Sequence, residues 1–200
     1  MSSPLSARAR FIAFRRSLPR TPRLHHLRIK ARGLDFAVFT TPEVHGAPPL
    51  VCVNGGLLFS HKLLWPALSP LAERRQLIFY DQRGRGESSA PPGEKAARIE
   101  HDAGDLGALR TALGYRRWDV LGHSWGGGIA VLGTEQDREG VRRLVLVNSV
   151  GPRSESWLPQ LHDAAVARLA AAQRAVLQHI DPVTLLTGDP AAQSAYSRAM

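Results

Sequence analysis

The sequence predicts an α/β fold organised around a mainly parallel sheet. Short apolar runs alternate with segments of helical periodicity, the pattern of strands joined by right-handed crossover helices. Runs such as Leu50–Val53 are hydrophobic at every position, as in strands buried on both faces. The third observation is a G-x-S-x-G pentapeptide, Gly122 to Gly126, which stands between an apolar run and a helical segment.

The first elements are predicted to be strands. Leu24 to Ala31 and Leu34 to Thr40 flank Arg32-Gly33, which predicts a β-hairpin. After a Pro-rich loop, Leu50–Val53 forms the next strand, which ends at Asn54-Gly55-Gly56. Two further elements follow: a helix from His61 to Leu71, predicted from apolar residues at helical spacing, and a strand over Leu77-Ile78-Phe79.

Helices and strands continue to alternate through the middle of the chain. We expect a helix from Ile99 to Leu113 that ends at Gly114, a strand from Trp118 to Leu121, a helix over Gly126 to Leu132 and a strand from Val141 to Val147. Beyond Pro152 the pattern changes. Apolar positions between Leu158 and Ile180 predict one long amphipathic helix, and Asp189-Pro190 begins another.

Composition places the chain among ordinary globular proteins. Its 200 residues suffice for one domain with a substantial core, and 44% are hydrophobic and 22% charged. No apolar run reaches the roughly 18 residues that indicate a membrane span. Cys52 is the single cysteine, so an internal disulfide is excluded and a reducing, cytoplasmic compartment is expected. Its place in an apolar strand predicts a buried core residue.

The net charge of +9 comes from the N-terminal region. Residues 1–33 hold nine Arg and Lys and no acid, whereas the remaining 17 basic residues balance the 17 acids. Such a segment suits an anionic membrane surface, nucleic acid or a targeting peptide. No aromatic interleaving accompanies it, so nucleic-acid binding is not expected. We expect residues 1–23 to be a disordered, solvated extension, unless the start codon lies further downstream.

The pentapeptide predicts a nucleophilic serine. A sharp strand-to-helix turn would lift Ser124 above the sheet, and Gly122 and Gly126 tolerate the crowded backbone that this turn needs. The helix that follows directs its N-terminal amides at the space above the serine. The backbone N–H of Trp125 is therefore the first predicted donor to a tetrahedral oxyanion. The second is expected from the loop after Val53, where Gly56 is the preferred candidate and Gly55 the alternative.

Three motifs resemble those of the α/β-hydrolase superfamily, and within it the proline iminopeptidase group. That group shows His-Gly-Gly-Pro-Gly, Asp-Gln-Arg-Gly-x-Gly-x-Ser and Gly-x-Ser-Trp-Gly-Gly. The chain has Asn54-Gly55-Gly56-Leu57-Leu58, Asp81-Gln82-Arg83-Gly84-Arg85-Gly86-Glu87-Ser88 and Gly122-His123-Ser124-Trp125-Gly126-Gly127. Asn54 and Leu57 depart from the group's His and Pro. The second motif is expected to be a turn that Asp and Arg hydrogen bonds hold beside the site.

The resemblance implies an α/β-hydrolase fold whose core occupies residues 24–150. Residues 151–200 would begin a helical cap (lid), and the sheet would lack its last strands, which carry the acid and the histidine of a Ser–acid–His triad. His162 and His179 are the histidines after Ser124, and both are expected in the cap. His123 is expected to point away from the serine. No general base is assigned, so the 200-residue chain alone is expected to be inactive.

The leading hypothesis is a serine hydrolase that acts on small amides or esters through an acyl-enzyme on Ser124. An N-terminal proline peptide is one substrate that the resemblance implies. Two alternatives remain: a non-catalytic ligand-binding protein on the same fold, or an inactive truncated product that folds poorly. No His, Cys and Asp cluster has metal-ligand spacing, so neither a metal nor an organic cofactor is expected. The oligomeric state is not predicted.

Overall fold

The computed structural model describes residues 23–56, 59–91, 98–152, 163–164, 166–180 and 195. The chain divides into two compact units, Met1–Pro152 and Arg153–Met200. The first unit contains the sheet. The predicted extension before Arg23 and the predicted helix start at Asp189-Pro190 lie outside the described residues.

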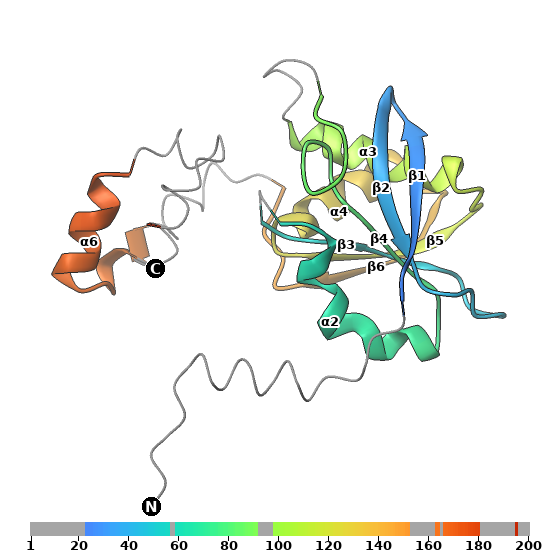
Figure 1. The fold of residues 1–200 in the computed structure, drawn as a ribbon, viewed down its shortest axis with the longest axis horizontal. Coiled ribbons are helices and arrows are strands. Elements are labelled where there is room, and N and C mark those ends of the chain that lie inside the picture. The colour runs from blue at the N-terminus through green and yellow to red at the C-terminus, as the bar shows by residue number, and fades with distance from the viewer. Residues whose placement is uncertain are drawn as a thin grey trace, which may run out of the picture. The chain divides into compact units, whose positions relative to one another are not determined.

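The sheet has six strands in the order β1-β2-β4-β3-β5-β6 (Figure 1). Strand β2 pairs antiparallel with both β1 and β4, whereas β3, β4, β5 and β6 are parallel to one another, which confirms the predicted mainly parallel sheet. The strand bounds are β1 His25–Ala31, β2 Leu34–Thr40, β3 Leu50–Val53, β4 Leu77–Tyr80, β5 Trp118–His123 and β6 Val141–Val147. Because β3, β4 and β5 are parallel, their carboxyl ends at Val53, Tyr80 and His123 lie on the same side of the sheet, and so do the loops that follow them.

The β1–β2 hairpin forms at Arg32-Gly33, as predicted. Both residues have positive φ, 49° and 76°, which is what a two-residue type I′ turn requires. The register then pairs Ala31 with Leu34 and continues to the pair His25 and Thr40.

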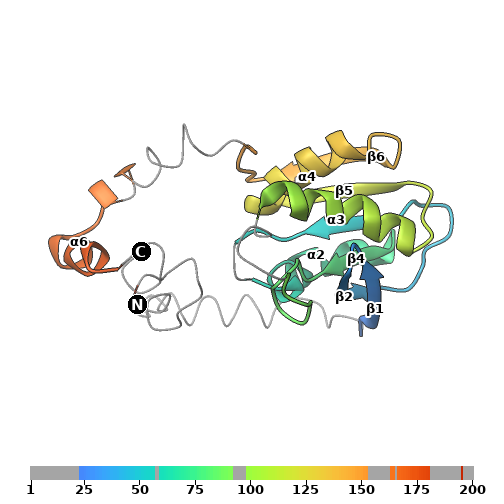
Figure 2. The ribbon, with the colours of Figure 1, turned by 90° about the horizontal axis from the view of Figure 1, so that it is seen from above.

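The core consists of two apolar layers, one on each face of the sheet. Alternate residues of β3 divide between them: Val51 and Val53 belong to the layer under helices α3 (Ile99–Ala112) and α4 (Trp125–Gln136). Leu50 and Cys52 belong to the layer that packs against α2 (Trp65–Leu68). Cys52 is therefore the core residue predicted, and burial raises the pKa of its thiol well above the usual range. Helices α3 and α4 lie side by side along the sheet (Figure 2).

The segment predicted as a helix from His61 to Leu71 is helical, but it is not one continuous helix. The segment forms three short pieces, η1 (His61–Leu63), α2 and η2 (Ser69–Glu73). Pro66 lies in the first turn of α2 and Pro70 in the first turn of η2. Proline tolerates a first turn but cannot donate an interior helical hydrogen bond, so a continuous helix through Pro70 is disfavoured.

The second unit contains α6 (Ala171–Gln178). The long helix predicted from Leu158 to Ile180 is wrong at residues 168–170, which are not helical. Ala170 is extended, with ψ 156°, and its N–H is accepted by the Gln173 side chain at 2.9 Å. This contact satisfies the amide outside the helix and marks a new helix start. The first residues of the predicted helix, 158–162, lie outside the described residues.

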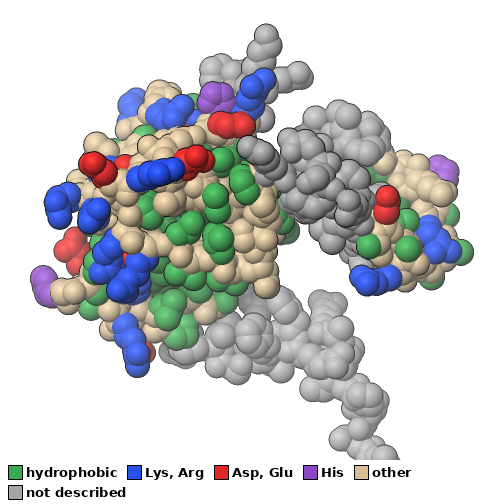
Figure 3. Space-filling view, turned by 180° about the vertical axis from the view of Figure 1, so that it is seen from behind, with side chains coloured by type: hydrophobic (Ala, Val, Ile, Leu, Met, Phe, Trp, Pro, Cys, Tyr) green, Lys and Arg blue, Asp and Glu red, His purple; other side chains and the backbone are tan. Residues whose placement is uncertain are grey.

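Strand β6 is an edge of the sheet with three exposed apolar side chains, Val145, Leu146 and Val147. Figure 3 shows the hydrophobic side chains grouped on this side of the molecule. Among the described residues, no helix combines the length and the apolar character needed to cross a bilayer.

Candidate active site

Ser124 lies between β5 and α4 in a backbone conformation that side chains rarely adopt. Its φ is 52° and its ψ is −122°. The Ser124 N–H donates to the Val147 carbonyl at 3.1 Å, and the Ser124 carbonyl accepts from the amides of Gly127 at 2.9 Å and Val150 at 3.1 Å. The end of β6 and the loop after it therefore hold the turn in place.

The two outer glycines of the pentapeptide are required by close backbone approaches. A Cβ atom on Gly122 would lie 2.6 Å from the Gly126 carbonyl oxygen. A Cβ atom on Gly126 would lie 2.5 Å from the carbonyl oxygen of Asn54, at the end of β3. Real Cβ contacts are not this short, so the G-x-S-x-G spacing reflects packing of the turn against itself and against β3.

The Asn54-Gly55-Gly56 segment lies against the turn. A Cβ atom on Gly55 would lie 2.6 Å from the Cβ of Ser124. Gly56 follows with φ 75°, which favours glycine. Within the described part of the chain, the amides of Gly56 and Trp125 form no hydrogen bond.

The Asn54 side chain closes the loop that contains Gly56. Its Nδ2 donates to the carbonyls of Phe59 at 2.9 Å and Gly55 at 3.3 Å. From the other side, Gln82 Nε2 donates to the Asn54 carbonyl at 2.7 Å. The loops that follow β3 and β4 are thus joined next to Ser124.

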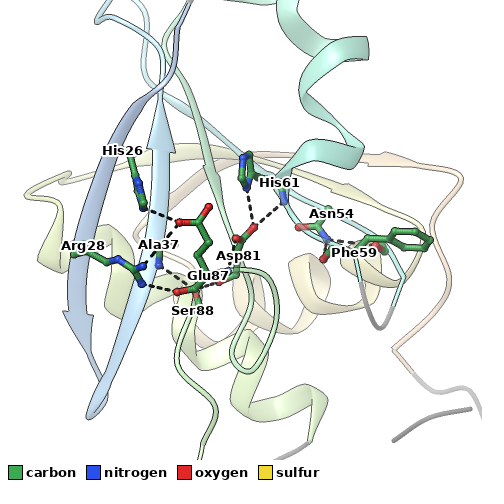
Figure 4. Close-up of polar contacts among 10 residues, drawn as sticks. His26, Arg28, Ala37, Asn54, Phe59, His61, Asp81, Glu87 and Ser88 are labelled. Atoms are coloured by element: carbon green, nitrogen blue, oxygen red, sulfur yellow. Dashed lines mark hydrogen bonds and ion pairs between the residues drawn. The ribbon is translucent and has the colours of Figure 1, made fainter. Parts of the chain in front are cut away.

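Sequence reasoning missed a buried pair, His61 and Asp81 (Figure 4). Asp81 Oδ1 accepts from the His61 backbone amide at 2.8 Å and lies 2.9 Å from His61 Nδ1, while Oδ2 accepts from the Glu87 amide at 2.9 Å. Burial would raise the pKa of Asp81, but these hydrogen bonds outweigh it and hold the pKa below its usual range. The signal in the sequence was an acid directly after a buried strand.

Arg83 anchors the second motif to α3. It donates two hydrogen bonds to the buried Asp105, at 2.7 and 2.5 Å. Asp102 lies one helical turn before Asp105. Its Oδ1 is 3.8 Å from Arg83 Nε, and its Oδ2 is 3.4 Å from Arg85 Nη1. Burial raises the pKa of Asp102 despite these cations. The turn predicted to be held by Asp and Arg hydrogen bonds is confirmed.

Comparison with known proteins decides the family. The model of the alpha/beta hydrolase fold family matches residues 48–188. The chain belongs to the α/β-hydrolase family. The sequence resemblance and the predicted fold class are thereby confirmed, and hydrolase chemistry is the family's activity class.

The similar curated proteins are longer than this α/β-hydrolase chain. A proline iminopeptidase of Lactobacillus helveticus is 36% identical over 119 residues, which cover 58% of the chain and 40% of that protein. A Caulobacter segnis protein named "Putative carbamate hydrolase RutD" is 31% identical over 74% of the chain and 56% of its own length. The chain therefore spans about 40% of the length of the proline iminopeptidase.

Solved structures agree with the fold. The crystal structure of VinJ has a TM-score of 0.73 and 25% identity, over 90% of this chain and 60% of that chain. An epoxide hydrolase from an endophytic Streptomyces has a TM-score of 0.54 and 25% identity, over 62% of this chain and 36% of its own.

The histidines of this α/β-hydrolase chain fall into different environments. His123 Nδ1 is buried and has no hydrogen-bond partner in the described structure. His179 Nδ1 lies 2.7 Å from the Ala175 carbonyl within the second unit. His162 and Leu57 lie outside the described residues. Among the described residues, no group of three His, Cys, Asp or Glu side chains could hold a metal ion.

Proposed function

We propose that the chain is a serine hydrolase in which Ser124 forms an acyl-enzyme with small amides or esters. The observation that carries the proposal is the backbone of Ser124, with φ 52° and ψ −122° between β5 and α4. A conformation of this kind costs of order 1–3 kcal/mol and is retained where it serves a function. Membership of a hydrolase family supports the same conclusion.

In the proposed reaction, Ser124 Oγ attacks the substrate carbonyl carbon and the carbonyl oxygen becomes an oxyanion. The backbone N–H of Trp125, at the start of α4, and that of Gly56 stabilise this charge. The C–N or C–O bond of the leaving group then breaks, and water releases the acyl group. A general base must take the Ser124 proton. We assign no residue to that role.

Peptides with an N-terminal proline belong to the proposed substrate class, because relatives at 31–36% identity are proline iminopeptidases. Asn54 and Leu57 differ from that group's motif, so esters and other small amides stay in the class. Residues 151–200 are proposed to begin a helical cap, and residues 1–23 to form a solvated extension. A cytoplasmic location is proposed from the single buried cysteine.

A second candidate function is ligand binding without turnover. It is favoured because two histidines that could serve as a general base have other partners. His179 Nδ1 contacts the Ala175 carbonyl, and His61 pairs with Asp81. Such a protein would bind its ligand beside Ser124 but would not activate the hydroxyl.

Labelling with a fluorophosphonate separates the two candidates. The hydrolase should be phosphonylated at Ser124, as located by peptide mass spectrometry, and Ser124→Ala should abolish the label. Ser149→Ala is the matched control, because Ser149 is exposed two residues after β6 and donates to the Val150 carbonyl. Ligand binding without turnover is favoured if the protein isolated from its natural source stays unlabelled over hours at millimolar probe.

A further inference from the structure

We propose that Asn54 is the positioning residue of the loop that carries Gly56. Its carboxamide sets the Gly56 amide and the Phe59 ring beside Ser124. The inference rests on the proposed function of Ser124 and extends it to a position where the chain departs from the proline iminopeptidase motif.

The Asn54 carboxamide bonds carbonyls on both sides of Gly56. Nδ2 donates to the Gly55 carbonyl before it and to the Phe59 carbonyl after it (Figure 4). The orientation of the amide follows from these contacts, because the opposite orientation would place Oδ1 against two acceptors. Asn54 is 1% exposed, so water does not compete for these bonds.

Fold stability alone does not account for the asparagine. Asn54 Oδ1 is buried and has no hydrogen-bond partner in the described part of the chain, which is unfavourable. The donor half of the carboxamide serves the loop, while its acceptor half is left without a bond.

The hydrogen bond from Asn54 Nδ2 to the Phe59 carbonyl also places an aromatic ring beside Gly56, the proposed oxyanion donor. The Phe59 ring lies directly over Gly56, where a Cβ atom would clash with it. Phe59 is 55% exposed, so the remainder of its ring is open. Gly55, the residue before Gly56, touches Ser124, so the ring borders the loop that lies against the proposed nucleophile. Asn54 therefore positions both an oxyanion donor and an apolar wall.

Asn54→Asp tests the donor directly. A carboxylate cannot donate to the Phe59 carbonyl, but its protonated form can. We expect the rate of fluorophosphonate labelling, relative to wild type at the same pH, to fall about 10- to 100-fold at pH 8 through misplacement of the loop. We expect much of it to return at pH 5, because burial against two carbonyl oxygens should raise the pKa of the introduced carboxyl above its usual range. Gln136→Glu is the matched control, because it also converts a carboxamide to a carboxylate, at an exposed side chain at the far end of α4 from Ser124.

Recovery at low pH distinguishes positioning from damage to the fold. Asn54→Ala should show the same loss at pH 8 without recovery at pH 5, because no proton can restore its donor. Equal wild-type-like labelling rates for Asn54→Asp, Asn54→Ala and Gln136→Glu at both pH values would overturn the inference.

A second readout does not depend on Ser124 chemistry. With 4-fluorophenylalanine in place of phenylalanine, the ¹⁹F signal of Phe59 is assigned by its absence in Phe59→Leu. We expect this signal to move toward that of free fluorophenylalanine in Asn54→Ala, and to do so in Asn54→Asp at pH 8 but not at pH 5. An unmoved signal overturns the inference. A moved signal in a protein that is never labelled supports the role of Asn54 in the loop and rejects the proposed function instead.

Discussion

Gly55 and Ser124 touch: a Cβ atom added to Gly55 would lie 2.6 Å from the Cβ of Ser124 and 2.6 Å from the His123 carbonyl oxygen. The loop after β3 and the turn after β5 are adjacent because β3 and β5 are parallel neighbours, with Val53 paired to Gly122. The contact thus joins two segments that are about 70 residues apart in the chain.

The first prediction is that Gly55→Ala impairs Ser124 more than it impairs the fold. The added methyl must displace the Ser124 side chain, so fluorophosphonate labelling should fall at least 10-fold, with a loss of about 1–3 kcal/mol in the free energy of unfolding. Gly128→Ala, in α4, is the control, because its Cβ would meet Ile99 at 3.3 Å and no part of Ser124. Equal labelling of both variants and wild type would contradict the prediction.

The second prediction concerns backbone strain at Ser124. Glycine adopts φ 52° and ψ −122° without strain, so Ser124→Gly removes the strain energy of the turn. Glycine also raises the entropy of the unfolded chain, which offsets part of this gain. The net result should be an increase of about 1 kcal/mol in the free energy of unfolding. Ser124→Ala keeps the strain and should have wild-type stability. Urea denaturation of the three proteins checks this. Equal stability of the Gly and Ala variants would show that the turn is unstrained.

The third prediction is a pH dependence at Asp81. The pKa of Asp81 is lower in the folded protein than in the unfolded chain, so its contribution to stability is present above about pH 4 and is lost as the pH falls through the folded pKa. At pH 7, Asp81→Asn should cost about 3 kcal/mol, because His61 and Glu87 lose a buried charged acceptor.

The difference between wild type and Asp81→Asn in the free energy of unfolding should shrink below pH 4. Asp35→Asn is the control for a lost carboxylate, since the exposed Lys30–Asp35 pair should contribute no more than about 0.5 kcal/mol. A difference that stays constant from pH 7 to pH 3 would rule out the ionised Asp81 as its source.

The fourth prediction separates stability from the site. Asp119 is buried near the start of β5 and accepts from Arg75 at 2.6 Å and from Arg142 at 2.8 Å. Asp119→Ala should cost about 3 kcal/mol. It should leave the labelling rate of the folded protein unchanged, because five residues of extended strand place Ser124 roughly 16 Å away. A loss of labelling in fully folded Asp119→Ala would contradict this separation.

Local chemistry explains why several elements could be predicted from sequence. Arg32-Gly33 between two alternating runs predicts a hairpin, and the uniformly apolar Leu50–Val53 predicts a buried strand; both were confirmed. The helical region predicted from His61 to Leu71 is divided into three short pieces, because Pro66 and Pro70 cannot donate interior helical hydrogen bonds. The oxyanion donors Gly56 and Trp125 and the nucleophile Ser124 stay predictions.

The sequence by itself determined the family, the parallel strands and the turn at Ser124, because these depend on hydrophobic periodicity and on glycines at short spacing. Only the tertiary structure decided that His61 pairs with Asp81 and that Gln82 binds the loop at Asn54. Those pairs form because parallel strands end at the same edge of the sheet, where buried polar groups must find partners. No local pattern specifies which of the available groups each of them meets.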